Sequence, residues 1–159
     1  LDSIEEKKLL PKDFIQAIKE FEKENKNVLS EEKMGLVYWD THFDNILVQG
    51  NKIVGIIDFE RTELGSIDFV LDIIKRMVDY PKKYMSEESE KFAKKEDYSK
   101  LLVWFKEYYP ELFDFTNLDK RLALYSIEQN LSTFMWYPKS KEVKEMLAKE
   151  VGWKNGKTN

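Results

Sequence analysis

The sequence predicts an α+β fold that is mostly helical and contains one small β-hairpin. Two β-branched runs, 46–48 and 53–57, flank Gln49-Gly50-Asn51-Lys52, which is a strong hairpin signal. Much of the remaining chain has apolar residues at helical spacing, punctuated by Pro110 and Pro138. The chain has 159 residues, of which 42% are hydrophobic, so one compact core can be buried.

The expected elements follow in chain order. A helix is predicted over 11–25, because Pro11 suits a first turn and the apolar residues share one face: Phe14, Ile15, Ile18 and Phe21. A β-prone run, 36–39, then ends at Asp40. After the hairpin, Ser66 is predicted to cap a helix over 67–79. The remaining helices are predicted at 87–95, 98–109, 118–136 and 141–151, before a frayed polar tail, 154–159.

Composition excludes several classes of protein. The net charge of −4 and pI near 5.3 argue against a nucleic-acid-binding surface. No run of about 18 apolar residues is present, so no membrane partner or membrane span is expected. The chain has no cysteine, which excludes disulfides and thiolate metal sites. A cytoplasmic location fits, although a lack of cysteine is compatible with any compartment.

Three polar residues surround the predicted hairpin. Asp40 and Asn45 are five positions apart, the interval of the kinase catalytic-loop pattern H-R-D-L-x-x-x-N. The hairpin starts directly after Asn45, and its second strand ends at Asp58. Closing the hairpin therefore brings Asn45 and Asp58 together, with Asp40 on the loop just before. Asp58-Phe59-Glu60 also stands where a kinase has D-F-G.

These residue types suit phosphoryl transfer. Mg²⁺ prefers hard oxygen ligands, which Asn45 and Asp58 could supply beside phosphate oxygens and water. Asp40, kept off the metal, would accept the proton of a substrate hydroxyl or orient that hydroxyl. A single aspartate at a strand end is more often a cap or turn residue. The combination of spacing, hairpin, Asp-Phe-Glu and a following helix favours the kinase-type site.

Two sequence blocks resemble the aminoglycoside phosphotransferase and choline kinase family. Residues 38–47, Y-W-D-T-H-F-D-N-I-L, resemble its H-G-D-x-H-x-x-N-I-L block, and residues 57–60, I-D-F-E, match its I-D-[FW]-E block. The resemblance implies that Asp40 is the catalytic aspartate, that Asn45 and Asp58 bind Mg²⁺, and that ATP is the co-substrate. His42 matches the second histidine of the block, but a loop-packing role is at least as common.

The chain departs from the family pattern at several positions. Tyr38-Trp39 replaces His-Gly, which adds bulk beside the site and changes backbone freedom. Phe43-Asp44 replaces a small Pro-Gly type pair, and Asp44 could be a second metal contact or a solvent-facing residue. Asp68 and Asp72 both lie near the position of the family's later supporting aspartate, and Asp68 is preferred.

The resemblance also implies which part of a kinase is present. The family's ATP-binding lobe precedes the catalytic block, but only about 35 residues do so here, and they have no V-A-I-K-like strand. We therefore expect a protein-kinase-like C-terminal lobe without its N-terminal ATP lobe, inactive until it meets that lobe of the same protein. The expected single domain, 1–159, comprises a leading helix (1–34), the catalytic loop, hairpin and supporting helix (35–80), a helical acceptor-side region (81–153) and the tail.

The acceptor side offers only weak signals. Trp104, Glu128 and Trp136 are candidates for binding a small-molecule hydroxyl acceptor, and aromatic rings with a carboxylate would suit a cationic one. Aromatic residues at helical spacing are more often part of a core. Glu128 is the most informative candidate, because it interrupts an otherwise apolar helix, although a Lys or Arg of a neighbouring helix could equally pair with it.

Three other interpretations fit parts of the pattern. Asp40-Thr41-His42 has the D-x-H spacing of metal-dependent phosphoesterases, but these enzymes usually need several histidines and the chain has one. A calcium loop fails because its glycine and closing glutamate are missing. A non-catalytic scaffold derived from a kinase lobe is permitted by Tyr38-Trp39. The intact set of Asp40, Asn45 and Asp58 argues against it.

Overall fold

The computed structural model describes residues 1–41, 43–92, 94–154 and 157–158. The protein is mostly helical, with small antiparallel sheets of two strands each. It divides into two compact units, one of 1–31 with 116–159 and one of 32–115. The expected single domain, 1–159, stays a prediction. No helix among the described residues is both long and apolar enough to cross a membrane.

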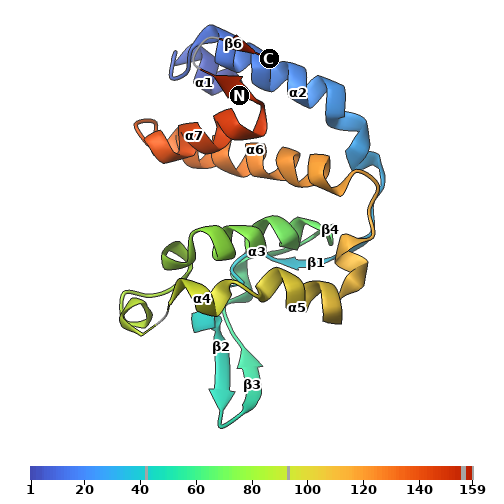
Figure 1. The fold of residues 1–159 in the computed structure, drawn as a ribbon, viewed down its shortest axis with the longest axis vertical. Helices are drawn as coiled ribbons and strands as arrows, with labels where there is room; N and C mark the ends of the chain where they lie inside the picture. The colour runs from blue at the N-terminus through green and yellow to red at the C-terminus, as the bar shows by residue number, and fades with distance from the viewer. Residues whose placement is uncertain (42, 93, 155–156, 159) are drawn as a thin grey trace. The chain divides into compact units, whose positions relative to one another are not determined.

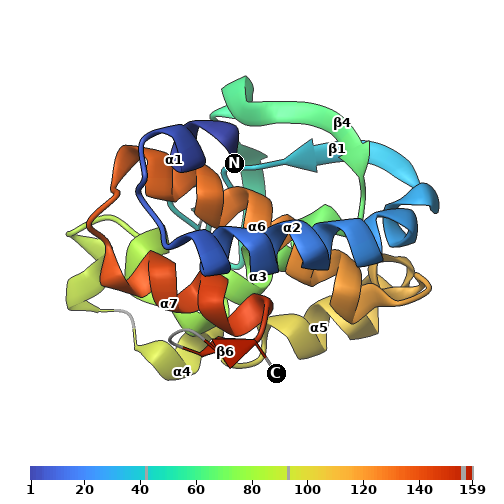
Figure 2. The same ribbon diagram turned by 90° about the horizontal axis from the view of Figure 1, so that it is seen from above.

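The first unit consists mainly of helices (Figures 1 and 2), and apolar side chains of these helices form a core. Phe14, Ile18 and Leu147 are completely buried in this core, which confirms the predicted apolar face of the first long helix. Asn117, before the longest helix, takes a left-handed conformation (φ 55°). The elements are α1 (Asp2–Glu6), α2 (Lys12–Asn25), the 3₁₀-helix η1 (Lys26–Ser30), α6 (Leu118–Trp136), α7 (Lys141–Glu150), β5 (Trp153–Lys154) and β6 (Lys157–Thr158).

The second unit carries the predicted site. Its small core joins Ile74 and Met77 of one helix to Tyr98 and Leu101 of the next two. The strands are β1 (Met34–Tyr38), β2 (Ile46–Gln49), β3 (Lys52–Ile56) and β4 (Thr62–Ser66). The α-helices are α3 (Phe69–Asp79), α4 (Lys95–Tyr98) and α5 (Leu101–Tyr108). The 3₁₀-helices are η2 (Phe43–Asn45), η3 (Phe59–Arg61), η4 (Pro81–Tyr84), η5 (Ser89–Lys91) and η6 (Pro110–Phe113).

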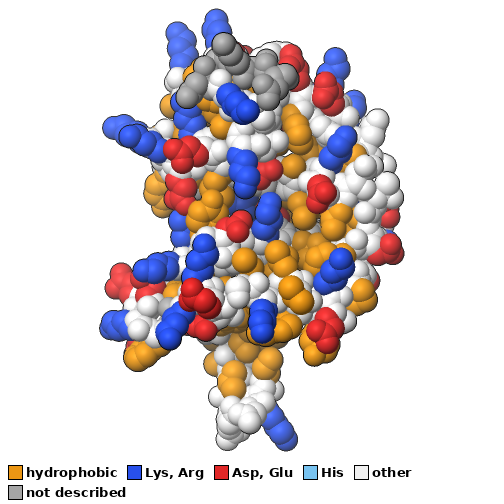
Figure 3. Space-filling view, viewed as in Figure 1, with side chains coloured by type: hydrophobic (Ala, Val, Ile, Leu, Met, Phe, Trp, Pro, Cys, Tyr) orange, Lys and Arg blue, Asp and Glu red, His pale blue; other side chains and the backbone are white. Residues whose placement is uncertain are grey.

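The predicted hairpin is confirmed. β2 pairs antiparallel with β3, with Ile46 opposite Ile56 and a register irregularity after Leu47. Gly50 in the turn has a φ of 61°, which glycine adopts without steric cost. The hairpin extends away from α3 and α5, and Figure 3 shows hydrophobic side chains along it. Val48, Ile53 and Val54 are each more than half exposed.

The pairing of β1 with β4 was not predicted from the sequence. Gly35 lies opposite Gly65 in this antiparallel pair. A Cβ atom on Gly35 would lie 2.5 Å from Cγ2 of Ile67, so only glycine fits where the strand passes that side chain. After the hairpin and η3 (Phe59–Arg61), the chain returns along β1 as β4, which leads to the start of α3.

Several sequence predictions are wrong in detail. Residues 87–95 do not form an α-helix; within the described part they contain the short η5 and the first residue of α4. Ser66 is the last residue of β4 and does not cap α3, whose N-cap is Asp68. The tail is not simply frayed, because β5 pairs with β6; 155, 156 and 159 lie outside the described residues. The helices predicted at 11–25, 67–79, 98–109, 118–136 and 141–151 are confirmed with small shifts at their ends.

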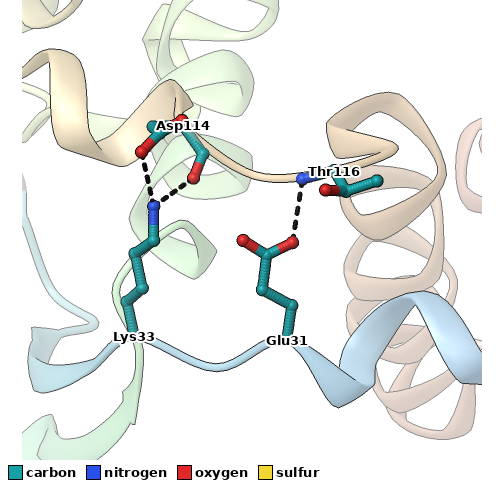
Figure 4. A network of polar contacts seen from close by, with 4 residues as sticks. All are labelled: Glu31, Lys33, Asp114 and Thr116. Atoms are coloured by element: carbon teal, nitrogen blue, oxygen red, sulfur yellow. Dashed lines mark hydrogen bonds and ion pairs between the residues drawn. The ribbon is translucent and has the colours of Figure 1, made fainter.

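The chain passes between the units at 31–32 and at 115–116. Within each unit, hydrogen bonds join the two chain segments next to these junctions (Figure 4). In the first unit, the backbone N–H of Thr116 donates to the Glu31 carboxylate (3.0 Å). In the second, the Lys33 ammonium donates to the Asp114 carboxylate (2.8 Å) and to the Asp114 carbonyl. The bond from Lys33 lowers the pKa of the Asp114 carboxyl.

Candidate functional site

The predicted catalytic loop is closed by hydrogen bonds to its own backbone. β1 ends at Tyr38, and the Thr41 hydroxyl donates to the Tyr38 carbonyl. The Asn45 amide nitrogen donates to the carbonyl of Asp40 (3.0 Å). Asn45 is buried and Asp40 is half-buried. The two residues that the sequence places five positions apart are thus joined directly, and Asn45 is the last residue of η2.

The open end of the hairpin meets this loop. The backbone N–H of Ile57 donates to the Asn45 carbonyl (3.0 Å), and the Tyr38 hydroxyl donates to the Ile57 carbonyl (2.6 Å). Ile57 directly precedes Asp58, so the residue before Asp58 is bonded both to Asn45 and to the end of β1. The expected meeting of the hairpin ends at the loop is therefore observed in the backbone.

Asp58 has an unusual backbone. Its φ of 64° and ψ of 55° lie in the left-handed region, which few residues other than glycine adopt and which aspartate tolerates better than most. Its side chain is exposed, at the junction of β3 and η3. Backbone strain of this kind occurs more often at functional sites than elsewhere.

Tyr38 and Trp39, which depart from the family pattern, fit the site without strain. The Tyr38 ring stacks on Phe59 at a centroid distance of 5.2 Å. The Trp39 ring packs against the ring of Phe69, the first residue of α3, at a centroid distance of 4.0 Å. The backbone N–H of Trp39 donates to the Arg61 carbonyl (3.0 Å). Trp39 is not among the described residues with a positive φ, so its backbone does not need the freedom of a glycine.

The two candidates for the supporting aspartate differ in their partners. Asp68 is completely buried and accepts a hydrogen bond from the Ser66 hydroxyl (2.6 Å). Asp72 is buried on α3 and accepts from Nε of Arg76 (2.7 Å). Burial raises the pKa of Asp72, and Arg76 opposes that rise. Asp72 is thus part of an ion pair within its own helix, whereas Asp68 lies at the junction of β4 and α3. The supporting role of Asp68 stays a prediction.

Asn45 and Asp58 carry oxygen atoms of the kind that Mg²⁺ binds, and their part in a metal site stays a prediction. Because Asn45 donates through its amide nitrogen, its oxygen is the atom suited to a cation, and Asp58 adds an exposed carboxylate. Across the described residues, no group of three or more His, Cys, Asp or Glu side chains could hold a metal. Two protein ligands are nevertheless typical for Mg²⁺, which keeps several waters and binds substrate phosphates.

His42 lies outside the described residues, so its predicted part in the loop stays a prediction. Asp44 was left open as a metal contact or a solvent-facing residue. Its two carboxylate oxygens accept hydrogen bonds from the Ser86 backbone N–H (2.7 Å) and the Ser89 hydroxyl (2.9 Å). No local pattern in the sequence indicates this contact, because the partners of Asp44 are more than 40 positions away.

The acceptor candidates belong to different units. Trp104 lies on α5 of the second unit, and Glu128 and Trp136 lie on α6 of the first. All three are exposed, so none of them is a core residue.

A cavity in the first unit adds a residue that sequence reasoning missed. Glu128 lines a cavity of about 550 Å³ together with Glu22 of α2, Lys26, and apolar side chains such as Leu124 and Met135. Burial raises the pKa of Glu22, the α-amino group of Leu1 lowers it, and Glu128 raises it further. No feature of the sequence singles out Glu22, which is one of several acidic residues on its helix.

Comparison with known protein families finds a match to part of the chain. The model of the phosphotransferase enzyme family matches residues 3–75, a span that includes Asp40, Asn45, Asp58 and Asp68. This match confirms the resemblance deduced from the two motif blocks and indicates a phosphotransferase-like domain. Neither the curated proteins nor the solved structures compared with the chain include a match.

Proposed function

We propose that residues 1–159 form the catalytic and acceptor-side part of a kinase that transfers the γ-phosphate of ATP to a hydroxyl group of a small molecule. The observation that carries this proposal is the bonded set at the hairpin base. Asn45 bonds both to Asp40 and to Ile57, the residue before Asp58. The family match over residues 3–75 supports the same reaction class.

Each residue of the set has a distinct role in this proposal. Asp40 orients the acceptor hydroxyl and takes its proton as the hydroxyl oxygen forms its bond to the γ-phosphorus. The bond from the γ-phosphorus to the bridging oxygen breaks, and its electron pair leaves with ADP. Asn45 and Asp58 would hold Mg²⁺, which neutralises charge on the phosphates when it is bound. The protein mainly positions groups, because the transition state is loose.

We further propose that a separate nucleotide-binding lobe completes the enzyme. The described residues form only two-stranded sheets, and a kinase covers its nucleotide with a larger sheet and a lysine. The hairpin exposes Val48 and Ile53, which lie opposite one another in the two strands, and exposed apolar side chains of this kind are typical of a surface that a partner covers. Without that lobe, residues 1–159 are expected to bind ATP weakly and to transfer no phosphate.

The acceptor that we propose carries a positive charge, as an aminoglycoside, choline or a similar amine does. The residue types that support it are the aromatic rings of Trp104 and Trp136 and the carboxylate of Glu128, which suit an organic cation. The proposal of a cationic acceptor is secondary to that of phosphoryl transfer and can fail without it.

The test is a screen of acceptors with the complete protein, meaning this chain joined to its nucleotide-binding lobe. It would be incubated with Mg²⁺ and γ-labelled ATP, together with aminoglycosides, choline, ethanolamine, amino alcohols or sugars. We expect label in one class of hydroxyl compound and none in its deoxy analogue, which serves as the matched control. Label in no compound, with ATP bound normally, would contradict the proposed function and favour the scaffold interpretation.

A further inference from the structure

Two adjacent residues of the predicted catalytic loop contact a distant part of the second unit. Phe43 and Asp44 belong to η2, between Asp40 and Asn45. Asp44 accepts from the Ser86 backbone N–H and the Ser89 hydroxyl, at 2.7 and 2.9 Å. We call residues 86–92 the acidic turn, because they include Glu87, Glu88 and Glu90.

The acidic turn is folded on itself before it meets Asp44. The Ser86 hydroxyl donates to the Ser89 hydroxyl (3.0 Å) and accepts from the Ser89 backbone N–H (3.2 Å). Backbone bonds from Glu90 to Ser86 and from Phe92 to Ser89, both 3.0 Å, close the turn. The donors that reach Asp44 are therefore presented together, and each meets a different carboxylate oxygen.

A second contact fixes the chain beyond the turn. The Phe43 ring stacks on Tyr98 at a centroid distance of 5.3 Å and an interplanar angle of 26°. Tyr98 is buried in the core with Ile74, Met77 and Leu101. Phe43 thus joins the loop to a fixed point of the helical core, and Asp44 joins it to the otherwise exposed acidic turn.

This arrangement gives Asp44 a role that neither earlier interpretation included. Both of its oxygens accept bonds from the acidic turn, so its observed partners are those of a tether. The loop that it tethers contains Asp40 and Asn45, and Asn45 directly follows Asp44. The acidic turn is consequently bonded to the residue that directly precedes Asn45, within the loop to which the proposed function assigns the chemistry.

We propose that Asp44 is a positioning residue that holds the acidic turn beside the catalytic loop, where the turn forms one wall of the acceptor site. The proposal rests on the proposed function, because it assigns this wall to the acceptor of that reaction. Asp44 itself contacts neither the nucleotide nor the reacting hydroxyl. Its loss should therefore weaken acceptor binding and leave nucleotide binding and the chemical step nearly unchanged.

The test compares Asp44→Ala, Asp44→Asn and Asp79→Ala in the complete protein. Alanine removes both carboxylate oxygens, whereas asparagine keeps one amide oxygen that can accept a hydrogen bond. Asp79, an exposed aspartate of the same unit, is the matched control. Amide hydrogen exchange of residues 86–92 and steady-state kinetics, with the acceptor and ATP varied separately, are the two measurements.

We expect Asp44→Ala to speed amide exchange in the acidic turn about tenfold, as the loss of two such bonds predicts. We also expect it to raise the acceptor KM about fivefold or more, with the ATP KM and kcat within about twofold of wild type. Asp44→Asn should give intermediate values in both measurements, and Asp79→Ala should resemble wild type.

Two results would overturn the proposal. Unchanged exchange in Asp44→Ala would show that no tether exists. Faster exchange with an unchanged acceptor KM, or with kcat and both KM values altered together, would show that the turn is not a wall of the acceptor site. If the wild-type protein transfers phosphate to no acceptor, the proposed function fails and the acceptor role fails with it, whereas the exchange measurement still identifies the tether.

Discussion

Asp58 combines an uncommon backbone with a proposed metal-binding side chain. A left-handed conformation costs an alanine about 1 kcal/mol or more, whereas asparagine and aspartate adopt it more readily. The backbone and the carboxylate can therefore be separated by two substitutions at this one position, since Asn keeps the conformational tolerance without the charge.

We expect Asp58→Asn to unfold at nearly the same urea concentration as wild type. In the complete protein, the same variant should need at least about tenfold more Mg²⁺ than wild type for half-maximal transfer. Asp58→Ala should show the same demand for Mg²⁺ and also lose about 1 kcal/mol of stability. A Mg²⁺ dependence of Asp58→Asn equal to that of wild type would remove Asp58 from the metal site.

The buried carboxyl of Asp72 should make stability depend on pH. Its pKa is raised by burial in the folded protein, with Arg76 opposing the rise. A raised pKa means that the folded state holds the proton more tightly than the unfolded state. The stability that this proton linkage contributes is therefore full below the ordinary value of 3.8 and is lost as the pH rises through the folded-state pKa.

Urea unfolding from about pH 3 to pH 7 would measure this linkage. We expect the free energy of unfolding of wild type, minus that of Asp72→Asn, to fall as the pH rises above 3.8. Asp79→Asn, at the exposed end of the same helix, provides the control for loss of a carboxylate. A difference that rises with pH would mean that the ion pair with Arg76 outweighs burial.

At the scale of secondary structure, Gly35 marks a close approach that the sequence did not reveal. The space beside it is occupied by Cγ2 of Ile67, 2.5 Å from where a Cβ would lie. Gly55 of the hairpin is a suitable contrast, because a Cβ there would meet Leu47 at an ordinary 3.5 Å.

We expect Gly35→Ala to destabilise the protein by about 1–3 kcal/mol, because the added atom must displace a packed side chain. The double variant Gly35→Ala/Ile67→Ala should lose less stability than the sum of the losses in the two single variants, since Ile67→Ala removes the clashing atom. Gly55→Ala should change stability by less than about 0.5 kcal/mol. Strictly additive losses at 35 and 67 would refute the close approach.

The sequence predicted the elements whose signals are local. The hairpin and the helices α2, α3, α6 and α7 follow from turn residues and apolar spacing within one segment. β4 was missed, because Thr62-Glu63-Leu64-Gly65-Ser66 has weak β propensity and becomes a strand by pairing with β1. The helix predicted at 87–95 was wrong, because its one large apolar residue, Phe92, is 79% exposed and short helices need packing to persist.

The same distinction applies to the candidate site. The neighbourhood of Asp40, Asn45 and the hairpin base could be predicted, because a two-stranded hairpin brings its ends together. The bonds from Asp44 to Ser86 and Ser89 could not, because they join segments more than 40 residues apart and leave no periodic pattern. Glu22 was missed for the same reason, since it shares a cavity with α6 only in the folded unit.

At the scale of the whole molecule, the proposed chemistry is concentrated in one of the two units. The loop, the hairpin and α3 all lie within 32–115, whereas the cavity lined by Glu22 and Glu128 lies in the other unit. The family match runs from the first unit into the second, over residues 3–75. The proposed phosphoryl transfer therefore depends first on Asp40, which lies in the matched segment and in the bonded loop.

The most direct test of this proposal is phosphoryl transfer by Asp40→Asn in the complete protein, measured beside nucleotide binding. We expect transfer to fall by about a thousandfold or more, because the variant cannot take the proton of the hydroxyl, while the Kd for Mg²⁺-ATP stays within about twofold. Asp79→Asn should leave both unchanged. Transfer by Asp40→Asn at close to the wild-type rate would contradict the assignment of Asp40 and with it the proposed centre.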